Sequence, residues 1–172
     1  MTEMLGMGLL YVGAVLIVNG IWLTGVGSDR DVALINIFAG VVTFLIPMWW
    51  AFGGYFGADG TPFDAASMLL FSFTYLWVAA NALRGIEDQR LFGWYCLFVA
   101  LIAAPTGWLV FDGGDIGLAL LWWIWAVLWF VFWVLLGLER NEYQTPIGWY
   151  TLITGILSGV AGYLMALGMW PW

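Results

Sequence analysis

The stretch that decides the fold is GLALLWWIWAVLWFVFWVLLGL, residues 117–138, which contains no charged side chain. A helix needs about 20 apolar residues to cross the hydrocarbon core of a bilayer. The stretch has that length, and it is bounded by Asp115 on one side and Glu139 on the other. It therefore predicts a transmembrane helix.

The rest of the chain repeats this pattern on both sides of that stretch. Charged residues fall in short clusters, and the apolar intervals between clusters are each long enough for one span and too short for two. The fold class predicted is an all-α membrane protein of six transmembrane helices, forming a single domain over residues 1–172. The predicted spans are residues 4–24, 32–53, 65–83, 91–110, 116–138 and 147–168.

The composition excludes several classes of protein. Of the 172 residues, 64% are hydrophobic and 9% are charged, whereas a soluble domain carries about 25% charged residues. The net charge is −7, and the chain has four arginines and no lysine. Contacts with nucleic acid phosphates need basic side chains, so no nucleic acid partner is expected, and the surroundings expected are membrane lipid.

The four arginines predict the orientation. Arg30 lies in the first connection, Arg84 and Arg90 in the third, and Arg140 in the fifth. Arginine is retained preferentially on the cytoplasmic side of a membrane, so both termini are expected outside. Six spans can also be divided into two sets of three with inverted topology, an arrangement known in transporters; sequence similarity between the two halves is weak.

The chain lacks the side chains that catalysis and ion coupling need. It has no histidine, and no ionisable residue falls inside a predicted span. Proton-coupled carriers and voltage sensors use such intramembrane groups. We therefore expect no enzyme, no metal site and no cofactor. Cys96 is alone and is interpreted as a small packing residue.

Tryptophan is unusually abundant, with 14 residues. Trp rings normally gather at the membrane interfaces. Trp122, Trp125 and Trp129, however, recur at i, i+3 and i+7 and share one helical face, and Trp125 and Trp129 lie near the middle of a span. Phe73 and Trp77, at i and i+4, share a face of another span. Two interpretations stay open at this point: aromatic packing between helices, or a narrow slot with aromatic walls for a flat neutral molecule.

Several segments, in this order, resemble the AmiS/UreI family of urea and short-chain amide channels. The similar segments are MLGMGLLYVGAVLIVNG (residues 4–20), NIFAG (36–40), LLFSFTYLWVAAN (69–81), WYCLFVA (94–100), the W-x-x-W-x-V-L-W run (122–129) and ITGIL (153–157).

This resemblance implies a passive channel for urea or small aliphatic amides in the bacterial inner membrane, with a pore inside each protomer of a homohexamer. The alternative is a membrane scaffold or sensor whose Trp-rich faces only pack against partners. Carried over by position, the family's pore lining falls on Leu9, Val12, Leu16, Asn19, Phe73, Trp77, Trp122, Trp125, Trp129 and, in the last span, Thr154.

The chain also departs from the acid-gated members of that family. Those members have histidine-containing outer loops and an acidic residue in the last span, at the position of Thr154 here. This chain has short outer loops and no histidine. Because histidine is the side chain that ordinarily titrates between about pH 5 and 8, gating by mild acid is not expected.

Overall fold

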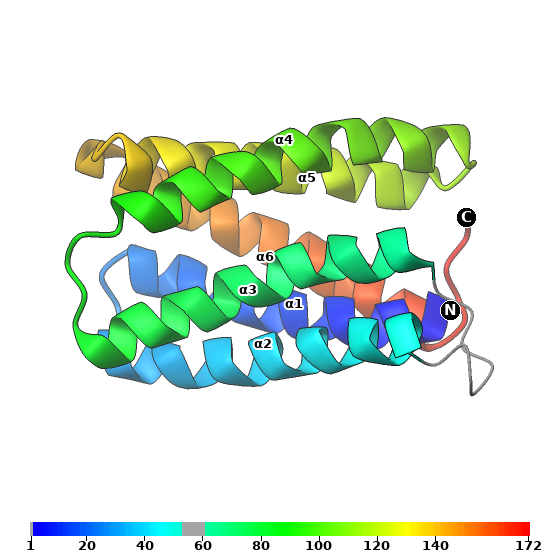
Figure 1. Ribbon diagram of the computed structural model, residues 1–172, viewed down its shortest axis with the longest axis horizontal. Helices are drawn as coiled ribbons and strands as arrows, with labels where there is room; N and C mark the ends of the chain where they lie inside the picture. Colours follow the sequence, from blue (N-terminus) through cyan, green and yellow to red (C-terminus); the bar gives the residue numbers. More distant parts are fainter. Residues whose placement is uncertain (1, 53–60) are drawn as a thin grey trace.

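The computed structural model describes residues 2–52 and 61–172. Their helices are the following: α1 (Thr2–Leu23), α2 (Asp29–Phe52), α3 (Pro62–Arg84), α4 (Arg90–Asp112), α5 (Ile116–Phe132) continued by a π-helical turn (Trp133–Gly137), a 3-10 turn (Asn141–Tyr143) and α6 (Gln144–Ala166). All six long segments are apolar enough to cross a membrane. This confirms the all-α fold with six candidate spans, whose axes run roughly side by side along the bundle (Figure 1).

Most of the helices begin earlier than the charge-free intervals predicted. α2 begins at Asp29 rather than at residue 32, and α3 begins at Pro62 rather than at residue 65. The reason is that carboxylates are favourable in the first turn of a helix, where the helix dipole is positive. Charged residues thus enter the helices only in their terminal turns. The predicted end of the second span, residue 53, lies outside the described residues.

The start and end of α3 show how local sequence sets these boundaries. Thr61 accepts a hydrogen bond from the backbone N–H of Asp64, and Asp64 accepts one from the backbone N–H of Thr61, so the two form a reciprocal capping box. At the other end Gly85 adopts a left-handed conformation with φ 63°, which glycine enters without steric cost. A side-chain capping box therefore starts the helix, and the backbone conformation of a glycine ends it.

The helices form three closely packed antiparallel pairs: α1 with α6, α2 with α3, and α4 with α5. Figure 1 shows α4 and α5 together on one side of the bundle, with α1 and α2 on the other. The predicted inverted repeat of two three-helix sets stays a prediction.

Glycines bring α1 and α6 into backbone contact. They recur every seven residues on both helices, at positions 6, 13 and 20 of α1 and at 148, 155 and 162 of α6. A Cβ added to Gly13 would lie 2.4 Å from the Cα of Gly159. Small residues allow this approach, which is a common way to pack helices in membranes, and a seven-residue period maintains one contact face along a left-handed pair.

Buried polar side chains join other helices. Asn19 of α1 and Asn36 of α2 exchange two side-chain hydrogen bonds of 3.1 and 2.7 Å, and both residues are buried. Ser72 of α3 donates to the carbonyl oxygen of Gly40 on α2 over 2.9 Å. Hydrogen bonds of this kind hold helices together where no water is available.

Both termini lie at one end of the bundle, which we call the terminal end (Figure 1). The opposite end, which we call the arginine end, holds Arg30, Arg84, Arg90 and Arg140 at helix ends or connections.

We predict that the arginine end faces the cytoplasm. In a Cys96→Ser background, Asp112→Cys should react with a membrane-impermeant maleimide added to intact cells, and Arg84→Cys should react only after the membrane is opened. Both positions are exposed in the structure, so each is accessible from its own side. Labelling of both cysteines in intact cells would contradict the orientation.

Candidate functional site

Three cavities lie one after another between the helices. The first, at the terminal end, has a volume of about 110 Å³. The second is narrow, at about 40 Å³, and the third, at the arginine end, measures about 270 Å³. We call them the terminal, narrow and arginine-end cavities.

The odd-numbered helices α1, α3 and α5 line all three cavities in chain order. Each of these helices runs from the terminal end to the arginine end, so residues one or two turns further along contact the next cavity. The residues that line the cavities include, in the terminal cavity, Leu9, Val12, Ser67, Phe71, Trp122 and Trp125; in the narrow cavity, Leu16, Asn19, Tyr75, Val78, Trp129 and Phe132; and in the arginine-end cavity, Trp22, Leu23, Asn81, Ala82, Phe132 and Leu136.

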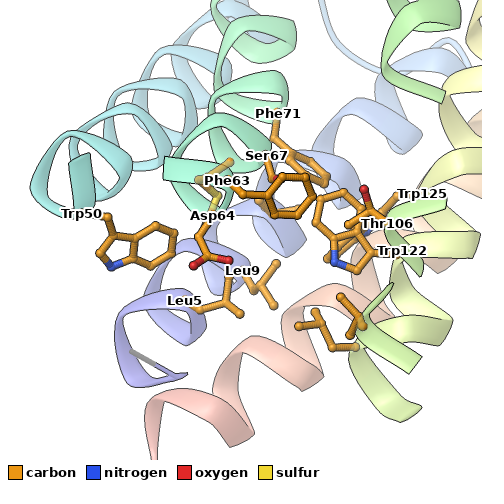
Figure 2. Close-up of a pocket in the computed structure, with 14 residues that line it drawn as sticks. Leu5, Leu9, Trp50, Phe63, Asp64, Ser67, Phe71, Thr106, Trp122 and Trp125 are labelled. Carbon is orange, nitrogen blue, oxygen red and sulfur yellow. The ribbon is translucent and has the colours of Figure 1, made fainter. Parts of the chain in front are cut away.

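The terminal cavity is mainly apolar, with a few polar side chains in its lining. Figure 2 shows the Asp64 carboxylate near Leu5 and Trp50, with Ser67 further along α3 and Thr106 on the opposite side. The Thr61 backbone N–H and hydroxyl both donate to one carboxylate oxygen of Asp64, over 2.9 and 2.7 Å. The capping box therefore fixes the position of the one charged group that lines this cavity among residues 2–52 and 61–172.

A cluster of four aromatic rings separates the terminal cavity from the narrow one. The ring of Phe71 meets Trp122, Trp125 and Trp129 edge-on, with ring centroids 5.4, 4.9 and 4.4 Å apart. These are contact distances for aromatic pairs, and each such pair contributes about 0.5–1.5 kcal/mol beyond area burial. We call these four rings the aromatic constriction.

The narrow cavity offers polar atoms to a small molecule. Tyr75 is 4% exposed, and among the described residues its hydroxyl has no hydrogen-bond partner. A buried hydroxyl without a partner costs roughly 1–3 kcal/mol, which a solute that binds there would offset. The amide of Asn19 is already paired with Asn36, whereas the Tyr75 hydroxyl is available to bond a solute.

A chain of hydrogen bonds from α6 holds Trp125 in the aromatic constriction. Its indole N–H donates to the hydroxyl of Ser158 over 3.0 Å, and Ser158 in turn donates to the carbonyl oxygen of Thr154 over 2.8 Å. The indole is 1% exposed. The nitrogen is thus turned toward α6, which leaves the apolar part of the ring for the cavity side.

The predicted site residues of α1 and α5 lie along these cavities. Leu9, Val12, Trp122 and Trp125 line the terminal cavity, and Leu16, Asn19 and Trp129 line the narrow cavity. Their assignment to a pore stays a proposal.

The structure places two of the predicted pore residues, Phe73 and Trp77, away from the cavities. They are 42% and 37% exposed on the outside of the protomer and line none of the three cavities. Phe73 packs against Phe44, and Trp77 packs against Phe92 and Tyr95. The reason is that α3 is rotated about its own axis by about half a turn from the orientation that would point these two rings at the cavities.

Phe71 and Tyr75 occupy the cavity-facing positions of α3 that the sequence reading missed. They have the same i, i+4 spacing as Phe73 and Trp77. Both pairs continue to an apolar residue at i+7, Val78 and Ala80, so the sequence pattern did not distinguish the two faces.

Thr154 also lies apart from the three cavities. It is 1% exposed and lines none of them. Its backbone carbonyl accepts the hydrogen bond from Ser158. Thr154 therefore contributes to the support of Trp125 rather than to a cavity wall.

Comparison with known proteins identifies the family. The family model described as AmiS/UreI family transporter matches residues 4–169. The chain belongs to this family. It is a multi-pass membrane protein of a transporter family, which agrees with the six apolar helices.

Two AmiS/UreI relatives and one solved structure show the range of the similarity. A protein of Mycolicibacterium smegmatis named as a transporter of amidate substrates is 38% identical over 168 residues, which cover 96% of this chain and 78% of the relative. The acid-activated urea channel of Helicobacter pylori is 30% identical, over 97% of this chain and all of the relative. The crystal structure of the Helicobacter pylori urea channel matches with a TM-score of 0.84 at 28% identity, over 96% and 99% of the two chains.

Proposed function

We propose that the protein is a passive channel for urea or small aliphatic amides, with one pore in each protomer that runs through the three cavities and the aromatic constriction. The observation that carries the proposal is the order of cavities along α1, α3 and α5, closed at one place by four aromatic rings. The names of the relatives, an amidate transporter and a urea channel, supply the solute class.

The chemistry of the constriction suits a flat neutral solute. The cavity walls are mainly apolar, so an ion that left its hydration shell would find few compensating groups. A planar amide can instead lie against aromatic ring faces and lose less hydration. The buried Tyr75 hydroxyl can donate a hydrogen bond to its carbonyl oxygen.

The proposal extends to assembly and location. The apolar outer surface of the protomer includes exposed rings on its helices, such as Phe73, Trp77 and Trp149. Such rings suit lipid or a neighbouring protomer. We propose a homohexamer in the bacterial inner membrane.

A flux measurement on purified protein tests the function. Proteoliposomes placed in an osmotic gradient of urea, formamide, acetamide or propionamide should re-swell several-fold faster than protein-free vesicles for at least the smaller solutes. A scaffold or sensor would leave the vesicles as impermeable as the protein-free control. That result would contradict the proposal for all four solutes at once.

We predict that flux does not respond to mild acid. The chain has no histidine, and the pKa of the Asp88 carboxyl is shifted away from the range between pH 5 and 8. The Arg90 guanidinium donates hydrogen bonds to the Asp88 carboxylate and lowers the pKa of that carboxyl to about 2. The stability that this pair contributes is lost only as the pH falls through that value, so it is constant from pH 5 to 8. Amide flux should stay within about twofold over this range.

A stopped-flow pH series on the proteoliposomes measures this, with the external pH varied and the internal pH held at 7. A several-fold rise on external acidification would contradict the prediction. It would direct attention to Asp112 and Asp115 at the terminal end, which the double Asn variant would then test.

A further inference from the structure

Trp22, in the last turn of α1, lies where the cavities of the arginine end meet. Together with Leu23 it lines the narrow cavity, the arginine-end cavity and a side cavity of about 350 Å³ that also touches Gln144 at the start of α6. Leu23 is buried against Leu135 and Ile147. Val78, Phe92 and Phe132 also line both the narrow and the arginine-end cavities, and Trp22 is an aromatic side chain that all three cavities share.

A hydrogen bond fixes this indole. Trp22 Nε1 donates to a carboxylate oxygen of Asp29, in the first turn of α2, over 3.0 Å. The connection between them can fold back because Gly25 and Gly27 adopt φ of +95° and +87°, values that side chains rarely permit. Asp29 itself lines both wide cavities.

The cavity lining changes from mainly apolar to more polar at Trp22. On one side of Trp22 the narrow cavity has mainly apolar walls, and on the other side Asn81, Glu87 and Gln89 line the arginine-end cavity. A solute that moves between the two exchanges ring contacts for hydrogen bonds with amide and carboxylate groups. The residue at such a boundary decides which solutes can make the exchange.

We propose that Trp22 is a second, size-selecting filter at the arginine end and that Asp29 is its positioning residue. The proposal rests on the proposed function and deepens it. The filtered molecules are neutral aliphatic amides that pass the aromatic constriction but differ in chain length. Fixed by Asp29, the indole narrows the exit; without that bond the ring can turn and the exit widens.

The test compares acetamide and butyramide flux in proteoliposomes. Trp22→Ala should raise the butyramide-to-acetamide flux ratio several-fold. Asp29→Ala should raise it in the same direction by less, and Asp29→Asn, which retains an acceptor oxygen, should keep the wild-type ratio. In the Trp22→Ala background, Asp29→Ala should add nothing, which separates positioning from a general structural effect.

Trp149→Ala, which removes an exposed ring on α6, serves as the matched control and should leave the ratio unchanged. A folded Trp22→Ala protein with the wild-type ratio would overturn the filter while leaving the channel intact. Should Trp22→Ala fail to assemble, equal ratios in Asp29→Ala and Asp29→Asn would overturn it in the same way. Wild-type vesicles no more permeable than protein-free vesicles would overturn the proposed function, and the filter with it.

Discussion

Replacing Phe71 by alanine should raise propionamide flux relative to urea flux by about tenfold, which corresponds to about 1.4 kcal/mol in the difference between the two barriers. Phe71 is the one ring that contacts all three tryptophans of the aromatic constriction. Removing it joins the terminal and narrow cavities through a wider opening, and the larger solute gains most. Trp129→Ala should shift the ratio in the same direction.

Phe73→Ala is the matched control for this experiment. It removes the same ring from the same helix two residues away, on the outer face, where the side chain is 42% exposed. Its flux ratio should equal that of the wild type. An equal shift in both variants would mean that a general loosening of α3, rather than the constriction, sets the selectivity.

Gly13→Ala should destabilise the protein strongly, whereas Gly159→Ala should be tolerated. The added Cβ at Gly13 would meet the backbone of α6 at 2.4 and 2.5 Å, and it could be accommodated only by moving the helices apart. Overpacking costs about 1–3 kcal/mol even where side chains can yield. At Gly159 the same methyl group would meet the Cα of Gly13 at 3.6 Å, an ordinary contact.

Thermal unfolding in detergent and the monodisperse fraction on size-exclusion chromatography measure both variants. Gly13→Ala should lower both, and Gly159→Ala should change neither by much, because alanine also favours a helix by about 1 kcal/mol over glycine. Equal behaviour of the two variants would show that α1 and α6 are not held in backbone contact.

The six spans could be predicted because charged groups are costly in hydrocarbon. Asp29, Arg84 and Asp115 therefore mark helix ends or lie within one turn of them, and the apolar intervals between such residues have the length of a membrane. The π-helical turn at Trp133–Gly137 was not predicted. It accompanies a close approach of α4, where a Cβ on Gly93 would meet the backbone N of Gly137, and no sequence pattern marks such a contact.

The cavity-facing side of α3 was beyond sequence reasoning for a physical reason. In a soluble protein the outer face of a helix is polar, so the buried face stands out. In a membrane the outer face is as apolar as the interior, and α3 carries aromatic pairs on both. Phe71 and Tyr75 could be separated from Phe73 and Trp77 only by the packing itself.

Methylthiolation of Cys96 tests most directly whether solutes pass through the protomer. Cys96 is 1% exposed and lines the narrow cavity with Tyr75 and Trp129, so a small added group must occupy that space. After treatment with methyl methanethiosulfonate, we predict that amide flux falls in proportion to the fraction modified, measured by mass spectrometry. Dithiothreitol should restore it, and the Cys96→Ser protein should be unaffected. Complete modification of Cys96 with unchanged flux would contradict a pore through this cavity.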